Sequence, residues 1–166
     1  MEKINEYWTT GNIEESISIM REAAQRLIDR KEQIWDLSYL NAESLQNSTE
    51  EFYVLWKDNE SIATFILSFE DKLFWPELSN DMSSAFIHKL AVRNNYTGKG
   101  YGKKCIDKAI EVCNSRKISS LRLDTDPNRP KLCKFYENLG FKLQQTKKVQ
   151  INNSKIIDIA LYKLDL

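Results

Sequence analysis

The order of helical and strand-like segments predicts an α/β fold with a mixed, mostly antiparallel sheet flanked by helices. Three observations carry this prediction: the chain opens with a helical pattern, its middle runs from a strand through a glycine loop into a helix, and it closes with a hairpin pattern. The 166 residues fit one globular domain, and 42% hydrophobic residues with 18 aromatics promise a substantial core. We therefore expect a single domain over residues 1–166.

The first helix is expected over residues 12–31. Asn12 lies three residues before Glu15, which resembles a capping box, and apolar residues then recur every three or four positions. A second, shorter helix is expected around residues 34–40, where Ile34, Leu37 and Leu40 have helical spacing.

The next part of the chain is expected to be strands. Residues 52–56 and 62–69 are rich in β-branched and aromatic residues, and the polar residues 57–60 between them predict the turn of an antiparallel hairpin. A long acidic loop follows over residues 70–83. Residues 84–92 predict a third strand, which ends just before the glycine loop.

The last part should contain the best-defined helix, beginning near Tyr101, with an apolar stripe of Tyr101, Cys105, Ile106, Ala109, Ile110 and Cys113. A short strand over residues 118–123, a short helix over 131–138 and a hairpin of 141–151 with 156–164 complete the expected order.

Charge and composition exclude several functional classes. Lys plus Arg and Asp plus Glu each number 24, so no global field attracts nucleic acid. No apolar run is long enough to span a bilayer, and the first residues lack the order of a signal peptide, so we expect no membrane partner and a cytoplasmic location. The three cysteines have no CxxC spacing; we expect reduced, mostly buried thiols, with a catalytic thiol as the less favoured alternative.

The loop of residues 97–102 predicts an anion site. Glycines allow positive φ and close approach of a ligand, and the first turn of the following helix offers free N–H groups. A P-loop is excluded because Lys103 and Lys104, not Lys followed by Ser or Thr, come after the last glycine. The spacing is also not GxGxxG, so the Rossmann fingerprint does not fit.

The segment FIHKLAVRNNYTGKGYGKKCIDKAI resembles motif A of the GNAT superfamily of N-acetyltransferases. Gly100 and Gly102 match its glycine positions, whereas Thr97 stands where the family has Arg or Gln. Downstream, KFYENLGFKL resembles motif B, with Tyr136 among its matching residues. The resemblance covers residues 52 to 166 and implies a single-domain GNAT-like fold in which the central parallel strand pair splays apart.

The resemblance also implies acetyl-CoA as co-substrate, with no metal. Backbone groups of the strand would bind the pantetheine arm, one N–H near Leu90 would polarise the thioester carbonyl, and loop amides would hold the pyrophosphate. Asn128 resembles the family Asn that binds the cofactor arm, although it lies one residue farther from the Tyr than usual. The implied cofactor-binding residues are Leu90, Ala91, Val92, Gly98, Lys99, Gly100, Tyr101, Gly102, Lys103 and Asn128.

Two residues are implied as catalytic. Tyr136 matches the family's general acid, which would protonate the leaving thiolate, and His88 stands where one branch of the family has a proton-relaying His. A structural role for His88 is an equal alternative. Strand alternation would place His88, Leu90 and Val92 on one face, with Lys89 and Ala91 on the other.

The acceptor is expected to be a primary amine of a cationic small molecule. The acidic loop of residues 70–83 carries a net charge of −3, which would attract a cation. Candidate contacts are Trp35, Phe74, Trp75 and Asp124; Asp124 and Asp126 could steer the amine or only cap a turn. A protein or peptide acceptor, or a non-catalytic acetyl-CoA sensor, is the alternative function. The last hairpin could supply an edge for a homodimer.

Overall fold

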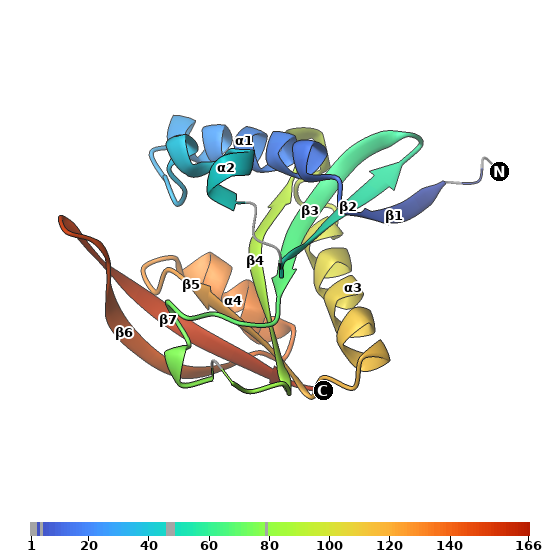
Figure 1. Ribbon diagram of the computed structural model, residues 1–166. Coiled ribbons are helices and arrows are strands. Elements are labelled where there is room, and N and C mark those ends of the chain that lie inside the picture. The colour runs from blue at the N-terminus through green and yellow to red at the C-terminus, as the bar shows by residue number, and fades with distance from the viewer. Residues whose placement is uncertain (1–2, 4, 46–48, 79) are drawn as a thin grey trace. The chain divides into compact units, whose positions relative to one another are not determined.

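Seven strands form one mixed sheet in the order β1-β2-β3-β4-β5-β7-β6 (Figure 1). The computed structural model describes all residues except 1–2, 4, 46–48 and 79. The elements are, in chain order, β1 (Glu6–Thr10), α1 (Ile13–Asp29), η1 (Leu37–Tyr39), α2 (Ala42–Leu45), β2 (Glu51–Lys57), β3 (Glu60–Ser68), η2 (Pro76–Leu78), β4 (Ser84–Val92), η3 (Asn94–Tyr96), α3 (Tyr101–Ser115), β5 (Ser120–Thr125), α4 (Pro130–Asn138), β6 (Lys142–Asn152) and β7 (Lys155–Asp165).

The predicted mixed sheet with a parallel pair is confirmed. The strands β4 and β5 run parallel, and their register covers the first three residues of each strand, from Ser84 opposite Ser120 to Phe86 opposite Arg122. The pairs β1–β2, β2–β3, β5–β7 and β6–β7 are antiparallel. The chain has the α/β fold class that the segment order predicted.

The chain divides into two units, residues 1–67 with 88–108 and residues 68–87 with 109–166. In the first unit the apolar face of α1 packs on the hairpin β2–β3 (Figure 1). Ile19 and Met20 are fully buried there, together with Val54 of β2. The helix begins where it was predicted, since the side chain of Asn12 accepts a hydrogen bond from the N–H of Glu15.

The turn between β2 and β3 has positive φ at both central residues, +49° at Asp58 and +69° at Asn59. This is the geometry of a type I′ turn, whose twist matches that of the strands, and Asp and Asn tolerate it better than most residues. The predicted hairpin is confirmed.

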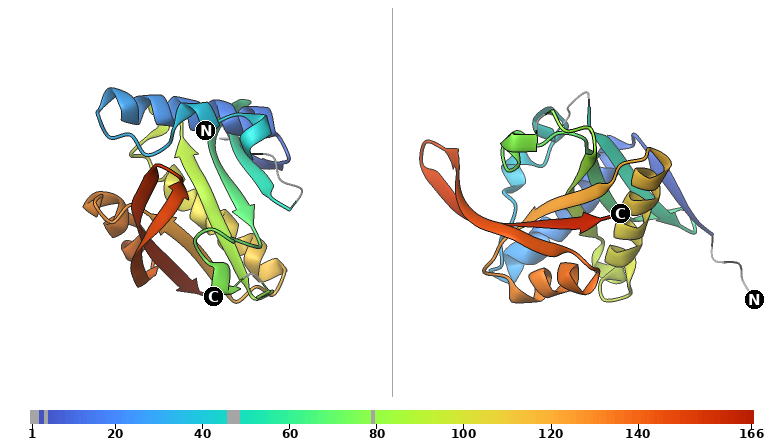
Figure 2. Two further views of the ribbon diagram at one scale, coloured as in Figure 1. Left: turned by 60° about the vertical axis from the view of Figure 1, so that its left-hand side comes forward. Right: turned by 90° about the horizontal axis from the view of Figure 1, so that it is seen from below.

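In the second unit, Trp75, Phe86, Ile159 and Leu161 form a buried cluster. The strands β6 and β7 form one long curved hairpin (Figure 2), and β6 lies at one edge of the sheet. The helix α4 begins with Pro130 as its first residue, a position where the missing N–H of proline costs nothing.

Two expectations for the N-terminal third are wrong. The short helix around residues 34–40 is a 3₁₀ turn, η1, followed by the four-residue helix α2. Asp36 accepts hydrogen bonds from Ser38 and Asn41 accepts one from Ser44, so both turns are closed by side chains rather than continued as one helix. The strand β1 lies before the first helix, where no strand was expected; it pairs with β2 from Glu6 to Thr10.

The helix α3 has the buried stripe that its spacing predicted. Tyr101, Cys105, Ile106, Ala109 and Cys113 are all buried. None of the helices in the described part of the chain is long and apolar enough to cross a membrane.

Candidate functional site

The glycine loop joins η3 to α3 and has the backbone geometry that the sequence predicted. The φ angles are +72° at Gly98 and +86° at Gly100, where an L side chain would be strained. A Cβ built at either glycine would have nothing within 4 Å, so the space above the loop is open. Glycine is therefore required at these positions by the backbone conformation and not by a lack of space for a side chain.

The N-terminus of α3 completes an anion site. Its first helical hydrogen bond joins the N–H of Lys104 to the carbonyl of Gly100 at 3.2 Å, so the N–H groups of Tyr101, Gly102 and Lys103 have no acceptor within the helix. The first turn contains no acidic residue that would take their place. Free N–H groups and the helix dipole together favour a bound anion.

The predicted lysines around the loop have different partners. Lys103 forms an ion pair with Asp107 one turn along the helix at 2.7 Å, so part of its charge is balanced. Lys104 bonds to Glu6 of β1. Lys99 is exposed within the loop, with its ammonium 5.7 Å from the ring centre of Tyr96.

The strand β4 leads into this loop, and its predicted alternation is wrong. Lys89 has a φ of +52°, and a residue in the left-handed region interrupts the alternation of side chains along a strand. Ala91 is buried, whereas His88, Leu90 and Val92 are half-buried. The ammonium of Lys89 lies 5.4 Å from the ring centre of Trp35, which packs at the edge of the first unit's core.

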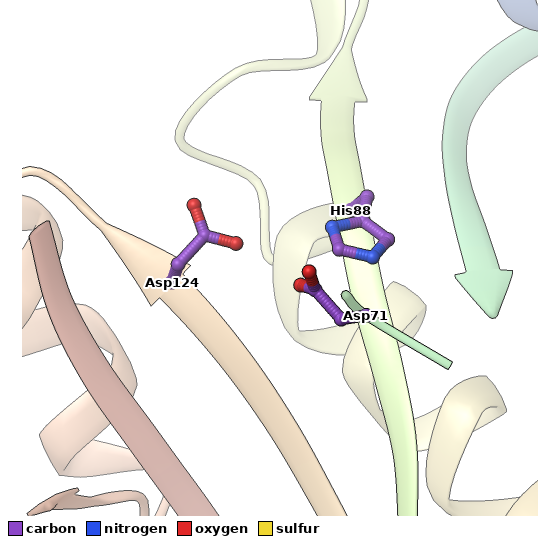
Figure 3. A group of neighbouring side chains, drawn as sticks. All are labelled: Asp71, His88 and Asp124. Carbon is purple, nitrogen blue, oxygen red and sulfur yellow. The ribbon is translucent and has the colours of Figure 1, made fainter. Parts of the chain in front are cut away.

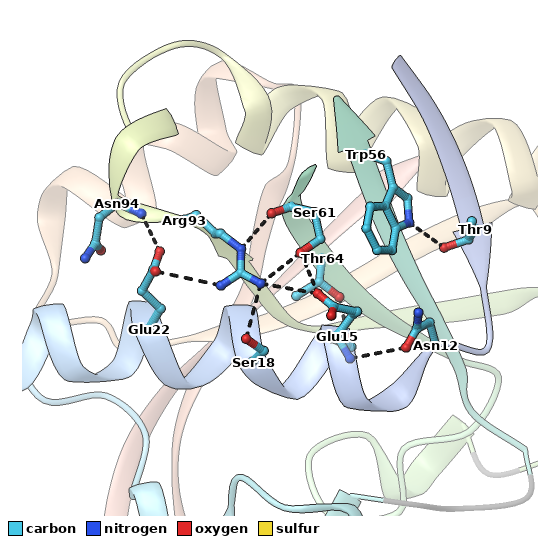
Figure 4. A network of polar contacts seen from close by, with 11 residues as sticks. Thr9, Asn12, Glu15, Ser18, Glu22, Trp56, Ser61, Thr64, Arg93 and Asn94 are labelled. Atoms are coloured by element: carbon cyan, nitrogen blue, oxygen red, sulfur yellow. Dashed lines mark hydrogen bonds and ion pairs between the residues drawn. The ribbon is translucent and has the colours of Figure 1, made fainter. Parts of the chain in front are cut away.

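A network of polar contacts around Arg93 fixes the end of β4 (Figure 4). The guanidinium of Arg93 donates to the carbonyl and the hydroxyl of Ser61, at 2.6 and 2.8 Å, and to the hydroxyl of Ser18 at 3.2 Å. Its nitrogens lie 3.4 and 3.7 Å from the carboxylates of Glu15 and Glu22 of α1.

The first residues after β4 are held by the same helix. Glu22 accepts a hydrogen bond from the N–H of Asn94 at 2.7 Å (Figure 4). Arg26 donates to the carbonyl of Val92 at 3.1 Å and to the side chain of Asn94. One lone pair of the Val92 carbonyl is thus engaged within the protein.

Sequence reasoning missed this role of α1, although a signal was available. Glu15, Ser18, Glu22 and Arg26 recur at spacings of three and four, which puts them on one polar stripe of the helix. A polar stripe that contains both acidic and basic residues is as typical of a helix face that bonds to another segment of the chain as of a face exposed to solvent.

In the second unit, Tyr136 lies on α4 and is only 8% exposed. Its ring makes edge contacts with Phe135 and Phe141, at 5.1 and 5.8 Å between ring centres, which fix its orientation. Asn128, in the turn before α4, is exposed, and its N–H donates to the carboxylate of Asp126 at 2.8 Å. Asp126 therefore caps this turn, one of the two roles weighed for it.

Two carboxylates of the second unit lie close together. Asp71 and Asp124 each offer an oxygen, and these oxygens lie within 4.8 Å of each other (Figure 3). Asp71 is 8% exposed and accepts hydrogen bonds from the N–H groups of Leu73 and Phe74, whereas Asp124 lies within β5 rather than after it. His88, drawn with them, belongs to β4 and to the first unit.

The aromatic residues of the acidic loop are less open than expected. Trp75 is 3% exposed and packs against Phe86, with the guanidinium of Arg122 4.8 Å from its ring centre; Phe74 is half-buried on the same cluster. The loop thus folds the side chains of Trp75 and Asp71 inward.

Burial removes two of the three thiols from consideration as nucleophiles. Cys105 and Cys113 are buried, and burial raises the pKa of both thiols, that of Cys113 to about 11. Only the thiolate is nucleophilic, so neither side chain can attack near neutral pH. Cys133 is half-buried and its thiol donates to the carbonyl of Asp126 at 3.5 Å.

Comparison with known proteins gives a family match and a set of structural neighbours. Residues 16–141 match the model of the acetyltransferase (GNAT) family. A search of curated proteins by sequence finds no match. The structure is similar to the ribosomal-protein-S18-alanine N-acetyltransferase of Escherichia coli, with a TM-score of 0.71 and 15% identity over 97% of this chain and 94% of that one.

Two further neighbours show the same fold. A GNAT-family acetyltransferase of Staphylococcus aureus Mu50 has a TM-score of 0.69 and 20% identity, over 98% of this chain and 99% of its own. A Bacillus anthracis structure in complex with acetyl coenzyme A has a TM-score of 0.58 and 21% identity, over 74% of this chain and 65% of its own.

Thiol reactivity tests the environment of the cysteines. We expect native protein to react at Cys133 first and at Cys105 and Cys113 only when it unfolds, because burial keeps both thiols protonated and out of reach. Alkylation with iodoacetamide at pH 7.5, followed by peptide mass mapping with and without urea, measures this. Rapid labelling of Cys113 in the native protein would contradict its assigned environment.

Proposed function

Since the chain belongs to the acetyltransferase (GNAT) family, we propose that it transfers the acetyl group of acetyl-CoA to the primary amine of a cationic small molecule. The observation that carries this proposal is the anion site of the first unit: two glycines with positive φ, free N–H groups at the start of α3, and nearby lysines. A polyphosphate donor fits that combination of shape and charge.

The donor would be held mainly by backbone groups. Amides of residues 98–103 would bind the pyrophosphate, with Lys99 and Lys103 adding positive charge and Asn128 contacting the arm. Leu90, Ala91 and Val92 would bind the pantetheine. A carbonyl oxygen has two lone pairs, so the bond from Arg26 to Val92 leaves one for the donor. Thr97 lacks the family's Arg or Gln side chain, which the backbone site does not require.

The reaction is a direct attack in a ternary complex. The ammonium of the acceptor loses a proton to His88, directly or through a water molecule, and the free amine attacks the thioester carbonyl. An N–H near Leu90 stabilises the oxyanion that forms. The new C–N bond replaces the C–S bond, and Tyr136 donates its proton to the departing thiolate of CoA. The nitrogen, which becomes cationic on attack, loses its second proton at this stage, and that proton passes through solvent to the Tyr136 phenolate; His88 releases its own proton to solvent.

A pair of carboxylates in the second unit supports a cationic acceptor. Two carboxylate oxygens within 4.8 Å, from Asp71 and Asp124, create a local negative potential that favours an ammonium group over a carboxylate or phosphate. Trp35, Phe74 and Trp75 are the apolar candidates for contacting the rest of the acceptor, although burial restricts Trp75 to a supporting position.

A protein or peptide acceptor is the second candidate. The Escherichia coli neighbour is named for an alanine of ribosomal protein S18, but at 15% identity that likeness carries the fold alone. A non-catalytic acetyl-CoA sensor would bind the donor and release no thiol.

Donor binding should raise the melting temperature. At acetyl-CoA concentrations near one hundred times Kd, the free energy of unfolding rises by about 2.7 kcal/mol, which raises the melting temperature by roughly 5–10 °C for a domain of this size.

Gly100→Ala should weaken donor binding, because Ala disfavours the backbone at φ +86°. Gly11→Ala is the matched control: Gly11 has φ +92° and equally open surroundings, so it should lose similar stability and keep its donor affinity. If millimolar acetyl-CoA does not raise the melting temperature of the wild-type protein, the proposal is wrong.

Tyr136→Phe should lower kcat by about 100-fold, since a positioned general acid contributes 10²–10⁴-fold. Thiol release from acetyl-CoA in a screen of amines measures the effect once an acceptor is found. Tyr162→Phe removes another buried hydroxyl, which donates to Glu137, and should cost stability but not kcat. Unchanged turnover in Tyr136→Phe would remove this residue from the mechanism.

His88→Ala should change the pH dependence of kcat/KM. A general base works only when unprotonated, so the wild-type rate should rise with pH through the titration of the base, and this acidic limb should be lost or displaced in the variant. Added imidazole should restore part of the rate. An acidic limb that persists unaltered in His88→Ala would assign His88 a structural role.

A further inference from the structure

Lysine ammonium groups and tyrosine rings alternate beside the glycine loop of the first unit. The ammonium of Lys99 lies 5.7 Å from the ring centre of Tyr96, and that of Lys57 lies 5.9 Å from the same ring. Lys57 also lies 5.8 Å from the ring centre of Tyr101, over which Lys104 lies at 5.1 Å. We call these five side chains the lysine–tyrosine cluster; its contacts are within the range of cation–π attraction.

Hydrogen bonds fix the two rings of the cluster. The hydroxyl of Tyr96 donates to Glu60 at 2.7 Å, and that of Tyr101 donates to Glu6 at 3.2 Å while accepting from Lys57 at 3.1 Å. The rings meet edge to face, 5.7 Å apart and inclined at 82°. Each ring thus has a set position; Lys99 lies near the ring of Tyr96 and Lys104 near that of Tyr101, whereas Lys57 contacts Tyr101 through its hydroxyl.

Lys57 keeps its positive charge and Tyr96 stays neutral. The hydrogen bond with Tyr101 raises the pKa of Lys57, and the bond to Glu60 raises the pKa of Tyr96, so the lysine stays cationic and the phenol stays neutral at physiological pH. The carboxylate of Glu6 pairs with Lys104 and offsets part of its charge, as Asp107 does for Lys103. An aromatic ring orients an ammonium without adding a negative charge.

The position of the cluster links it to the phosphates of the donor. Lys99 stands between the two glycines of positive φ, and Lys104 lies in the first turn of α3, so both ammonium groups belong to the loop that would hold the pyrophosphate. Charges act over about 8–10 Å at physiological ionic strength, so they need not touch the ligand. Of the donor's parts, only the ADP portion is anionic.

We propose that Tyr96 and Tyr101 are positioning residues that hold Lys57, Lys99 and Lys104 beside the loop and thereby make the enzyme select acetyl donors that carry the ADP portion. The inference rests on the proposed function, since it concerns the same donor site. It assigns the selectivity to two aromatic rings that have no counterpart in the glycine signature.

The test compares acetyl-CoA with S-acetyl-pantetheine, which has the same thioester and arm but no phosphate. Tyr96→Leu should raise KM for acetyl-CoA roughly threefold to fivefold, the loss expected for one cation–π anchor. Its KM for S-acetyl-pantetheine and its kcat at saturation should not change. The salt dependence of KM for acetyl-CoA should become shallower.

Two variants control this experiment. Tyr96→Phe keeps the ring and loses the bond to Glu60, so it should keep most of the wild-type KM. Tyr7→Leu removes another ring of the first unit, one that stacks on Trp56 and bonds to Asn59, and should leave both donors unaffected. These controls separate the positioning of lysines from a general loss of packing.

Equal changes of KM for both donors in Tyr96→Leu, or no change for either, would overturn the inference. Both results leave the proposed function intact as long as wild type binds acetyl-CoA. Failure of the wild-type protein to bind acetyl-CoA by calorimetry would instead overturn the proposed function, and the inference with it.

Discussion

The contact of Arg93 with α1 is the constraint on which the candidate donor site depends. A loop that binds through N–H groups has no side chain to steer it, so its orientation comes from the residues that anchor its ends. Arg93 is mostly buried, bonds to Ser61 of β3 and lies between the carboxylates of Glu15 and Glu22. Its planar guanidinium offers five donors in fixed directions, which a lysine could not reproduce. The first helix thereby sets where the glycine loop begins, although it is remote in sequence.

Local signals in the sequence were enough to predict most of the fold. The strand β4, the helix α3 and both hairpins have patterns of burial or turn residues that a short segment contains by itself. The strand β1 could not be predicted in this way, because five residues with little alternation become a strand only by pairing with β2. The same holds for Lys89, where a polar residue in a strand-like run gives no sign of its positive φ.

The candidate site was predictable to the extent that it consists of backbone. Gly98 and Gly100 predict positive φ angles in this loop, because glycine is the residue that adopts positive φ without strain. The contacts of the supporting side chains could not be predicted from local sequence. Lys57 bonds to Tyr101 and Glu6 pairs with Lys104, and the residues of each pair are far apart in the sequence. Asp71 belongs to a loop whose composition predicts exposure, yet two N–H groups of its own turn draw its carboxylate inward.

The zero net charge of the chain therefore hides two local clusters of opposite sign. The first unit gathers Lys57, Lys99 and Lys104 around neutral rings, where Glu6 and Glu60 oppose them and a helix N-terminus adds to them. The second unit holds Asp71 and Asp124 close together. An overall excess of either sign would attract one substrate of the proposed reaction and repel the other, since the donor is a polyanion and the acceptor a cation. A balanced charge over the whole chain, with two local clusters of opposite sign, allows both to be attracted.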